Sequence, residues 1–166
     1  MDVVSDTDNW QRTYEQTLAE EQSLDFPRFS HTDAWELGRA MVASAVESHY
    51  SVAIAINFGQ QRVFHAALPG SSATNDDWLD RKFRAVALHN CSSWALACQH
   101  RASDADYFGE SGYDRRTIAL AGGAVPLRVQ GSLIGAVGVS GLAEEDDHRF
   151  VVDALRRYLD GNTVAK

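Results

Sequence analysis

The most constraining feature of this sequence is a glycine-punctuated apolar segment at positions 121–142. Residues 125–129 form one apolar arm, and residues 130–132 supply a tight turn in which glycine can take a positive φ. The second arm, at 133–139, is apolar on both faces, as in a strand that is covered on both sides of a sheet. Two glycines within this arm weaken an isolated strand, so they predict the close approach of a packed helix or of a bound ligand. The segment therefore predicts a hairpin at the middle of a covered sheet.

Two helices are predicted before the first strand. Residues 9–22 carry a narrow stripe in which an aromatic residue or a leucine recurs every fourth position. Residues 34–46 follow a cap at Ser30 or Thr32 and carry a broader apolar stripe, to which Trp35 contributes as a core residue.

The remaining elements follow from the same two periodicities. In chain order they are a strand at 51–57, a returning strand at 62–66, a long helix from Thr74 or Asn75 to Cys98, an additional strand at 115–120, and a last helix that opens at 142–148 and stops at Gly161. We expect residues 1–26 to form an N-terminal helical extension, residues 27–161 a single domain, and residues 162–166 a tail.

Charge and cysteine content narrow the class of protein. The formal net charge of −8 disfavours nucleic acid and anionic membranes as partners. No apolar run is long enough to span a bilayer, and the acidic start of the chain lacks the pattern of a secretory signal. Cys91 and Cys98 fall in one predicted helix, about 10 Å apart along its axis, which is too far for a disulfide. Two reduced thiols predict a cytoplasmic protein.

Motifs that would identify a reaction are missing from the sequence. Gly122-Gly123 lacks the third glycine and the helix of a dinucleotide fingerprint, and there is no Walker loop, HExxH pair or CxxC. His148 follows Asp146 and Asp147, but consecutive helix positions point in different directions, so no metal site is predicted there.

A small basic cluster at the start of the long helix leaves two interpretations open. Arg81, Lys82 and Arg84 form either a solvated face or a corner that binds a carboxylate. Ser92 and Ser93 are expected in the middle of the same helix, where small residues permit close packing and where a hydroxyl could instead face a pocket.

Three signatures resemble a known family. The hairpin residues Gly122-Gly123-Ala124-Val125-Pro126-Leu127, Gly131, Ile134-Gly135 and Val139-Ser140-Gly141 resemble the GlcG/HbpS-like proteins, often labelled haem-degrading domains, which include the C-terminal domain of the PduO cobalamin adenosyltransferases. A middle signature, Asn75 to Lys82 followed by Ser92-Ser93, and an end signature, Ser140-Gly141-Leu142 with Glu145-Asp146-Asp147-His148, are similar to an uncharacterised subfamily with a yeast member. The resemblance covers roughly residues 27–159. This chain departs from the subfamily at Ala124 and Val125, and it lacks a histidine in the preceding run.

The resemblance implies an α+β fold, a profilin-like sandwich in which an antiparallel sheet of about five strands has helices on both faces. It also implies a homo-oligomer, for which the apolar residues of the N-terminal helix would suit an interface. Two of our three hypotheses about function follow from this resemblance. The chain is either a binding module that holds haem or another small ligand, or a scaffold in which Trp78, Arg81 and Lys82 join helix to sheet or subunit to subunit.

The third hypothesis is an enzyme that acts on a small anionic substrate. Asn75, Arg81 and Lys82 would orient a carboxylate near Gly122-Gly123, with His65 as the base. The full set of predicted ligand-binding residues is Asn75, Trp78, Arg81, Lys82, Gly122, Gly123 and His65.

Overall fold

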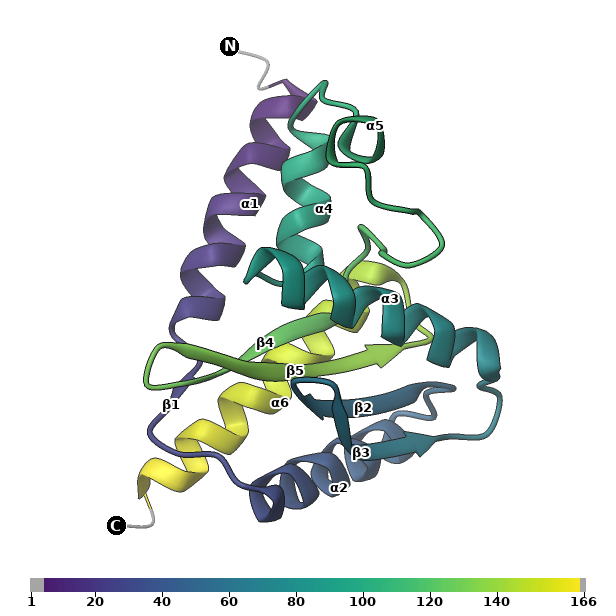
Figure 1. Ribbon diagram of the computed structural model, residues 1–166. Helices are drawn as coiled ribbons and strands as arrows, with labels where there is room; N and C mark the ends of the chain where they lie inside the picture. The colour runs from purple at the N-terminus through teal and green to yellow at the C-terminus, as the bar shows by residue number, and fades with distance from the viewer. Residues whose placement is uncertain (1–4, 165–166) are drawn as a thin grey trace.

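A computed structural model describes residues 5–164 and places a five-stranded sheet between two layers of helices (Figure 1). The strand order is β1-β4-β5-β2-β3, so β5 lies at the centre. Every pair is antiparallel except the short β1, which runs parallel to β4 at the edge. The strands are β1 (Asp25–Phe26), β2 (Ala53–Phe58), β3 (Gln61–Ala67), β4 (Ala124–Val129) and β5 (Ser132–Ser140). The predicted α+β sandwich is confirmed, with a mixed rather than wholly antiparallel sheet.

Helices cover both faces of this sheet and extend beyond one end of it. One face packs against α2 and α6, and the opposite face packs against α3. Figure 1 shows α1 and α4 side by side above the sheet, with the short α5 next to them. The helices are α1 (Asp6–Gln22), α2 (His31–Glu47), α3 (Ala73–His89), α4 (Ser93–Arg101), α5 (Tyr107–Ser111) and α6 (Glu144–Val164).

The second half of the central strand β5, residues 136–140, is buried on both faces, as its apolar composition predicted, whereas residues 132–135 are exposed or half-buried. Val137 and Val139 belong to the main core with α2 and α6, whereas Ala136 lies in the smaller core under α3. A Cβ atom at Gly138 would lie 2.8 Å from a ring carbon of Phe83, so only glycine lets α3 pack this closely. The predicted helix contact at this glycine is therefore confirmed.

The predicted long helix is in fact two helices. Asn90 ends α3 in the left-handed conformation at φ 52°, and Ser92 caps α4 by accepting a hydrogen bond from the Ala95 N–H at 3.0 Å. Cys91 and Cys98 therefore do not share a helix, and Ser92-Ser93 begins α4 instead of lying within a helix. Both thiols are free and buried, and burial raises the pKa of each to about 12, which makes them poor nucleophiles.

Four smaller predictions were also wrong. Trp35 is 60% exposed because α2 covers β3 at the open edge of the sheet, where only Phe64 meets the indole. Residues 115–120 form no strand, and Ile118 is buried instead beside α4. Ser72, not Thr74 or Asn75, is the N-cap of α3. The last helix continues past Gly161 to Val164, so residues 162–164 of the predicted tail are helical, and residues 165–166 lie outside the described part of the chain.

The N-terminal helix is covered by a neighbour within the same chain. Its apolar stripe, predicted as a subunit interface, packs against α4, and Trp10 meets Trp94 edge-on with ring centroids 6.1 Å apart. Glu21 is almost completely buried, and its two carboxylate oxygens accept the Ser92 N–H at 3.0 and 3.1 Å. This carboxylate binds the start of α4, where the helix dipole favours negative charge. The domain boundary after residue 26 stays a prediction.

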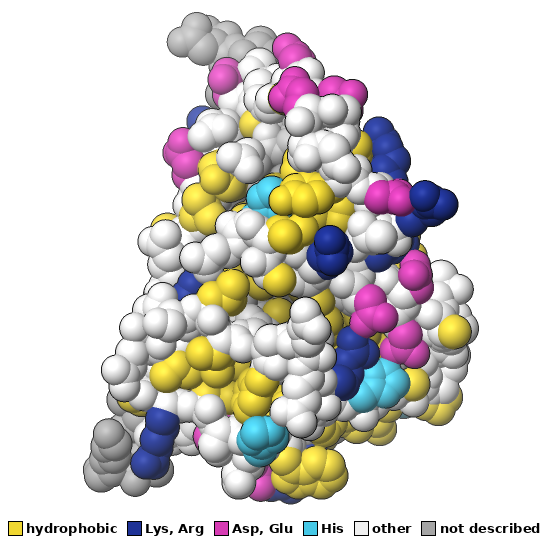
Figure 2. Space-filling model, in the orientation of Figure 1, with side chains coloured by type: hydrophobic (Ala, Val, Ile, Leu, Met, Phe, Trp, Pro, Cys, Tyr) yellow, Lys and Arg dark blue, Asp and Glu magenta, His cyan; other side chains and the backbone are white. Residues whose placement is uncertain are grey.

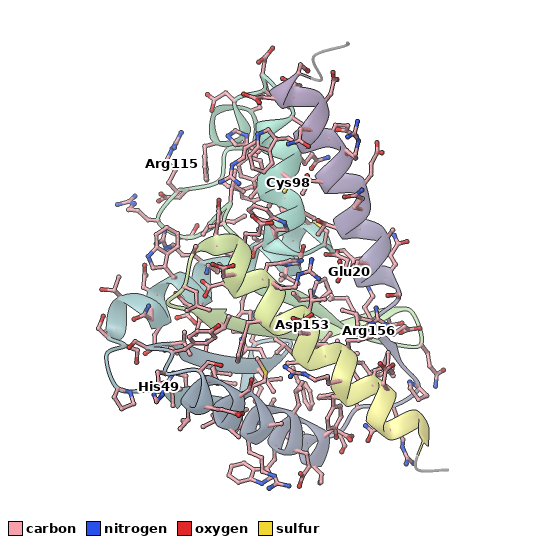
Figure 3. All side chains as sticks on the ribbon, turned by 180° about the vertical axis from the view of Figure 1, so that it is seen from behind. Glu20, His49, Cys98, Arg115, Asp153 and Arg156 are labelled. Atoms are coloured by element: carbon pink, nitrogen blue, oxygen red, sulfur yellow. The ribbon has the colours of Figure 1, made fainter. Side chains whose placement is uncertain are left out.

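On the face of the sheet opposite α3, the helix α6 crosses between α2 and α1 (Figure 3). Glu20 of α1 accepts a hydrogen bond from Arg149 of α6 at 2.5 Å, and Arg156 donates to Ser23. None of the helices within residues 5–164 is long and apolar enough to cross a membrane.

His148 of α6 makes stability depend on pH. Its side chain is 2% exposed, and Nδ1 has no hydrogen-bond partner within residues 5–164. Burial, and then the charge of Arg149, lower its pKa to about 4. The ring is therefore neutral in the folded chain but titrates near 6.5 when unfolded, so its contribution is complete above about pH 6.5 and is lost as the pH falls toward 4.

We expect acidification from pH 7 to pH 4 to cost the native chain about 3 kcal/mol more than it costs His148→Leu. Urea unfolding of both proteins at several pH values measures this difference. Parallel pH profiles for the two proteins would contradict the assignment.

Candidate functional site

Three of the predicted site residues come together where α3 passes the end of β5. Asn75, Trp78 and Lys82 line one side of a cavity of about 430 Å³, which we call the Lys82 pocket. The loop from β5 into α6 and the first turn of α6 form the opposite side. The remaining lining residues are Ala121, Ser140, Gly141, Leu142, Glu144 and Asp147.

A buried ion pair forms part of the wall of this pocket. The Lys82 ammonium donates to Asp147 Oδ2 at 3.0 Å and to the Val139 carbonyl at 3.4 Å, and both charged side chains are at least 96% buried. Asp147 Oδ1 accepts the Leu142 N–H at 2.9 Å. Burial raises the pKa of the Asp147 carboxyl, while Lys82 and the backbone N–H groups oppose that shift. The pair joins α3 to α6 past the end of the central strand.

Gly123 lies against this ion pair, and Gly122 lies against the start of α6 at Glu144. Gly123 has φ +135°, and a Cβ atom there would lie 2.6 Å from Lys82 Nζ and 2.5 Å from the Val139 oxygen. The Gly122 N–H donates to Glu144 Oε2 at 3.4 Å, and a Cβ atom would collide with the Glu144 carbonyl. Gly123 is therefore needed for the ammonium to reach its partners, and Gly122 is needed for the close approach of the Glu144 backbone.

The other two predicted residues lie elsewhere. Arg81 donates to Asp77 at 3.0 Å, and its guanidinium lies over the Trp78 ring, 4.0 Å from the centroid, outside the lining of the Lys82 pocket. His65 lies on β3, where its Nε2 is 2.7 Å from Asp76 Oδ1. The structure therefore does not bring His65 to Lys82, and it does not assemble the predicted group of carboxylate ligands and base.

His65 belongs to a second hollow, which we call the α3 groove and which consists of an apolar slot and an adjoining polar hollow. An apolar slot of about 210 Å³ is lined by Phe83 and Val86 of α3 and by residues 133–136 of β5. It shares Asn57 and Gln60 with an open polar hollow of about 550 Å³, and the polar hollow also contains Arg62, His65, Asp76 and Asp80. Figure 2 shows the side of the molecule that carries these hollows. Apolar side chains reach the surface there, and a histidine lies among basic and acidic side chains at the right of the view.

Sequence reasoning missed Asp147 and Arg62. Asp147 is one of four acidic residues at the start of α6, all of which suit the helix dipole, so nothing marked it as the partner of a lysine 65 positions earlier. Arg62 donates to Asn57 Oδ1 at 2.9 Å and lies over the Phe83 ring at 5.5 Å. Within residues 5–164 no group of three or more His, Cys, Asp or Glu side chains is placed to hold a metal ion.

Comparison with known proteins assigns the chain to a family. The model of the haem-degrading HbpS-like proteins matches residues 29–156. The chain belongs to the HbpS-like family. Its relatives include a UPF0303 protein of Streptomyces avermitilis, 41% identical over 142 residues, which covers 85% of this chain and 87% of the relative. A UPF0303 protein of Brucella canis is 37% identical over 90% of this chain and 89% of its own length.

Two solved structures share the fold. The Ybr137w protein aligns with a TM-score of 0.84 and 24% identity, over 98% of this chain and 99% of that one. A complex of PduOC with haem aligns with a TM-score of 0.67 and 22% identity, over 77% of this chain and 93% of that one. The HbpS-like family model begins after α1, whereas the alignment with Ybr137w extends over nearly the whole chain.

Proposed function

We propose that this HbpS-like chain is a haem-binding protein and that the α3 groove is its site. The observation that carries the proposal is the apolar slot that adjoins His65 across Asn57 and Gln60. Haem needs an apolar surface for its ring and, in most proteins, an axial side-chain ligand. The solved PduOC complex with haem, which shares this fold, supports the same ligand class.

The residues of the groove fit a haem. Asp76 holds His65 through Nε2, which leaves Nδ1 as the nitrogen for an iron, and a carboxylate on the other ring nitrogen raises the basicity of a ligating histidine. Arg62 is paired with Asp80 at 2.5 Å, so a propionate at the boundary between slot and polar hollow would have to share or displace that contact to reach the guanidinium. The slot of about 210 Å³ takes only an edge of the macrocycle, so much of the ring stays open to solvent or to another subunit. When bound, haem would supply a redox-active iron.

Titration with haemin tests this proposal. We expect a sharpened, shifted Soret band that saturates at one haemin per chain. His65→Ala should weaken binding by at least about tenfold, and Asp76→Asn should weaken it less, because Asp76 acts only through the histidine. His49→Asn, which changes an exposed histidine at the end of α2, is the matched control. Unchanged spectra at stoichiometric haemin, or equal binding by His65→Ala, would exclude this site.

A homo-oligomer is the second part of the proposal. With α1 packed on α4, the apolar surface best suited to a second copy lies on α2, where Trp35 is 60% and Val46 56% exposed. We expect a mass above that of one chain that persists on dilution, and a shift toward monomer in Trp35→Glu. Sedimentation across a dilution series measures both, and a monomer at every concentration would oppose the oligomer.

The alternative of an enzyme for a small anionic substrate has weaker support. Arg81 is paired with Asp77 and lies outside the lining of the Lys82 pocket, and the proposed base His65 lies in the other hollow. The buried free thiols support the expectation of a cytoplasmic protein.

A further inference from the structure

The Lys82 pocket is separate from the α3 groove and has an unbalanced set of hydrogen-bonding groups. An ammonium has three N–H donors, and Lys82 uses two of them on Asp147 and Val139. The Asn75 carbonyl oxygen accepts the Ser72 N–H, which leaves its amide NH₂ without a partner in the described part of the chain. Ser140, which is 4% exposed, adds a hydroxyl to the same lining. The pocket thus presents donors from three side chains, two on α3 and one at the end of β5.

The two carboxylates of the pocket are already engaged. Asp147 accepts from Lys82 with one carboxylate oxygen and from the Leu142 N–H with the other. Glu144 is paired with Arg101 through one oxygen and accepts the Gly122 N–H with the other. Each lining carboxylate is thereby neutralised by a cation, so the unmatched groups are donors, one of them positively charged. Such a site favours a ligand that brings a negatively charged acceptor.

The shape of the pocket limits the rest of the ligand. Trp78 is 37% exposed, and Arg81 covers its ring at 4.0 Å from the centroid, which fixes the indole as a flat apolar wall. Ala121 and Leu142 add apolar surface. A cavity of about 430 Å³ is in the range of small-molecule sites.

We propose that the Lys82 pocket binds a small monocarboxylate with a flat apolar body, its carboxylate on Lys82, Asn75 and Ser140 and its body against Trp78. The Lys82 pocket shares no lining residue with the α3 groove, so the two proposals are tested separately. The proposal for the Lys82 pocket is one of binding and includes no chemical step.

Benzoate is a suitable probe, with benzamide and benzylammonium as neutral and cationic analogues. Protein-observed NMR should show benzoate, at up to about 10 mM, shifting the Trp78 indole N–H and the Asn75 side-chain amide. Benzamide should bind more weakly, and benzylammonium should leave these signals in place.

The decisive variant is Asn75→Asp, which keeps an oxygen for the Ser72 N–H but replaces the amide donor with a second acceptor. An acidic residue in the first turn of α3 also suits the helix dipole, so the fold is retained. We expect at least about tenfold weaker benzoate binding. Asn9→Asp, which adds the same charge on the exposed face of α1, should bind as the native chain does. Equal affinity in Asn75→Asp, no shift at the highest concentration, or shifts confined to the α3 groove would each overturn the proposal.

Discussion

Replacing Lys82 with methionine is expected to lower the free energy of unfolding by about 3–5 kcal/mol. Methionine keeps the length of the side chain, so the loss comes from Asp147, whose carboxylate would stay 98% buried without its cation. Denaturation in urea at pH 7 measures the change through the shift in midpoint.

Two further variants distinguish the contribution of the ion pair to stability from that of side-chain packing. Lys82→Met combined with Asp147→Leu should recover most of the loss, because apolar groups can replace a buried pair at little cost once both charges are gone. Arg84→Met, which removes an exposed cation from the same helix, should stay within about 0.5 kcal/mol of the native chain. If the single and double variants unfold at the same midpoint, the ion pair does not hold α3 to α6.

Glu21→Ala is expected to cost about 3 kcal/mol. The substitution removes both oxygens that accept the Ser92 N–H, and it takes away the carboxylate 4.0 Å from Arg128. Arg128 is 9% exposed, and its Nη1 already lacks a partner in residues 5–164, so after the substitution the buried guanidinium keeps its hydrogen bonds to Asn90 but loses the carboxylate that faces it. The measurement is again the free energy of unfolding.

Glu21→Gln is the matched comparison, since an amide oxygen can still accept the Ser92 N–H. Burial raises the pKa of the Glu21 carboxyl, which means that the charged form is costly to bury, and the neutral amide avoids that cost. We therefore expect a loss of only about 1 kcal/mol. A large and equal loss in both variants would show that the charge, not the hydrogen bond, joins α1 to α4.

Local patterns were sufficient for four of the five strands and for the presence of helices on both faces of the sheet, but they did not predict the two-residue β1. The apolar run at 133–139 predicted a central strand, and Ser30 caps α2 with a reciprocal hydrogen-bond pair to Asp33. The break at Asn90 was missed because residues on both sides of it are apolar at helical spacing, and a left-handed asparagine leaves no periodic signal. Trp35 was misplaced because helical spacing gives the face of a helix but not how far the sheet extends beneath it.

The candidate sites likewise have a part that local sequence patterns predict and a part that depends on the strand order. Asn75, Trp78 and Lys82 share one helix face, so their gathering at one pocket follows from a spacing of three or four residues. His65 was assigned to the same site, but β3 is the edge strand on the far side of β2, and the strand order places it in another hollow.

The sequence alone determined most of the elements, the central place of β5 and the glycines that allow close contact, because these depend on periodicity and backbone freedom within a few residues. Only the tertiary structure decided that Asp147 neutralises Lys82, that Glu21 binds the start of α4, and that His65 faces Asp76. Each of these contacts joins residues that are at least 11 positions apart, and its energy depends on a distance and a burial that exist only after the chain has folded.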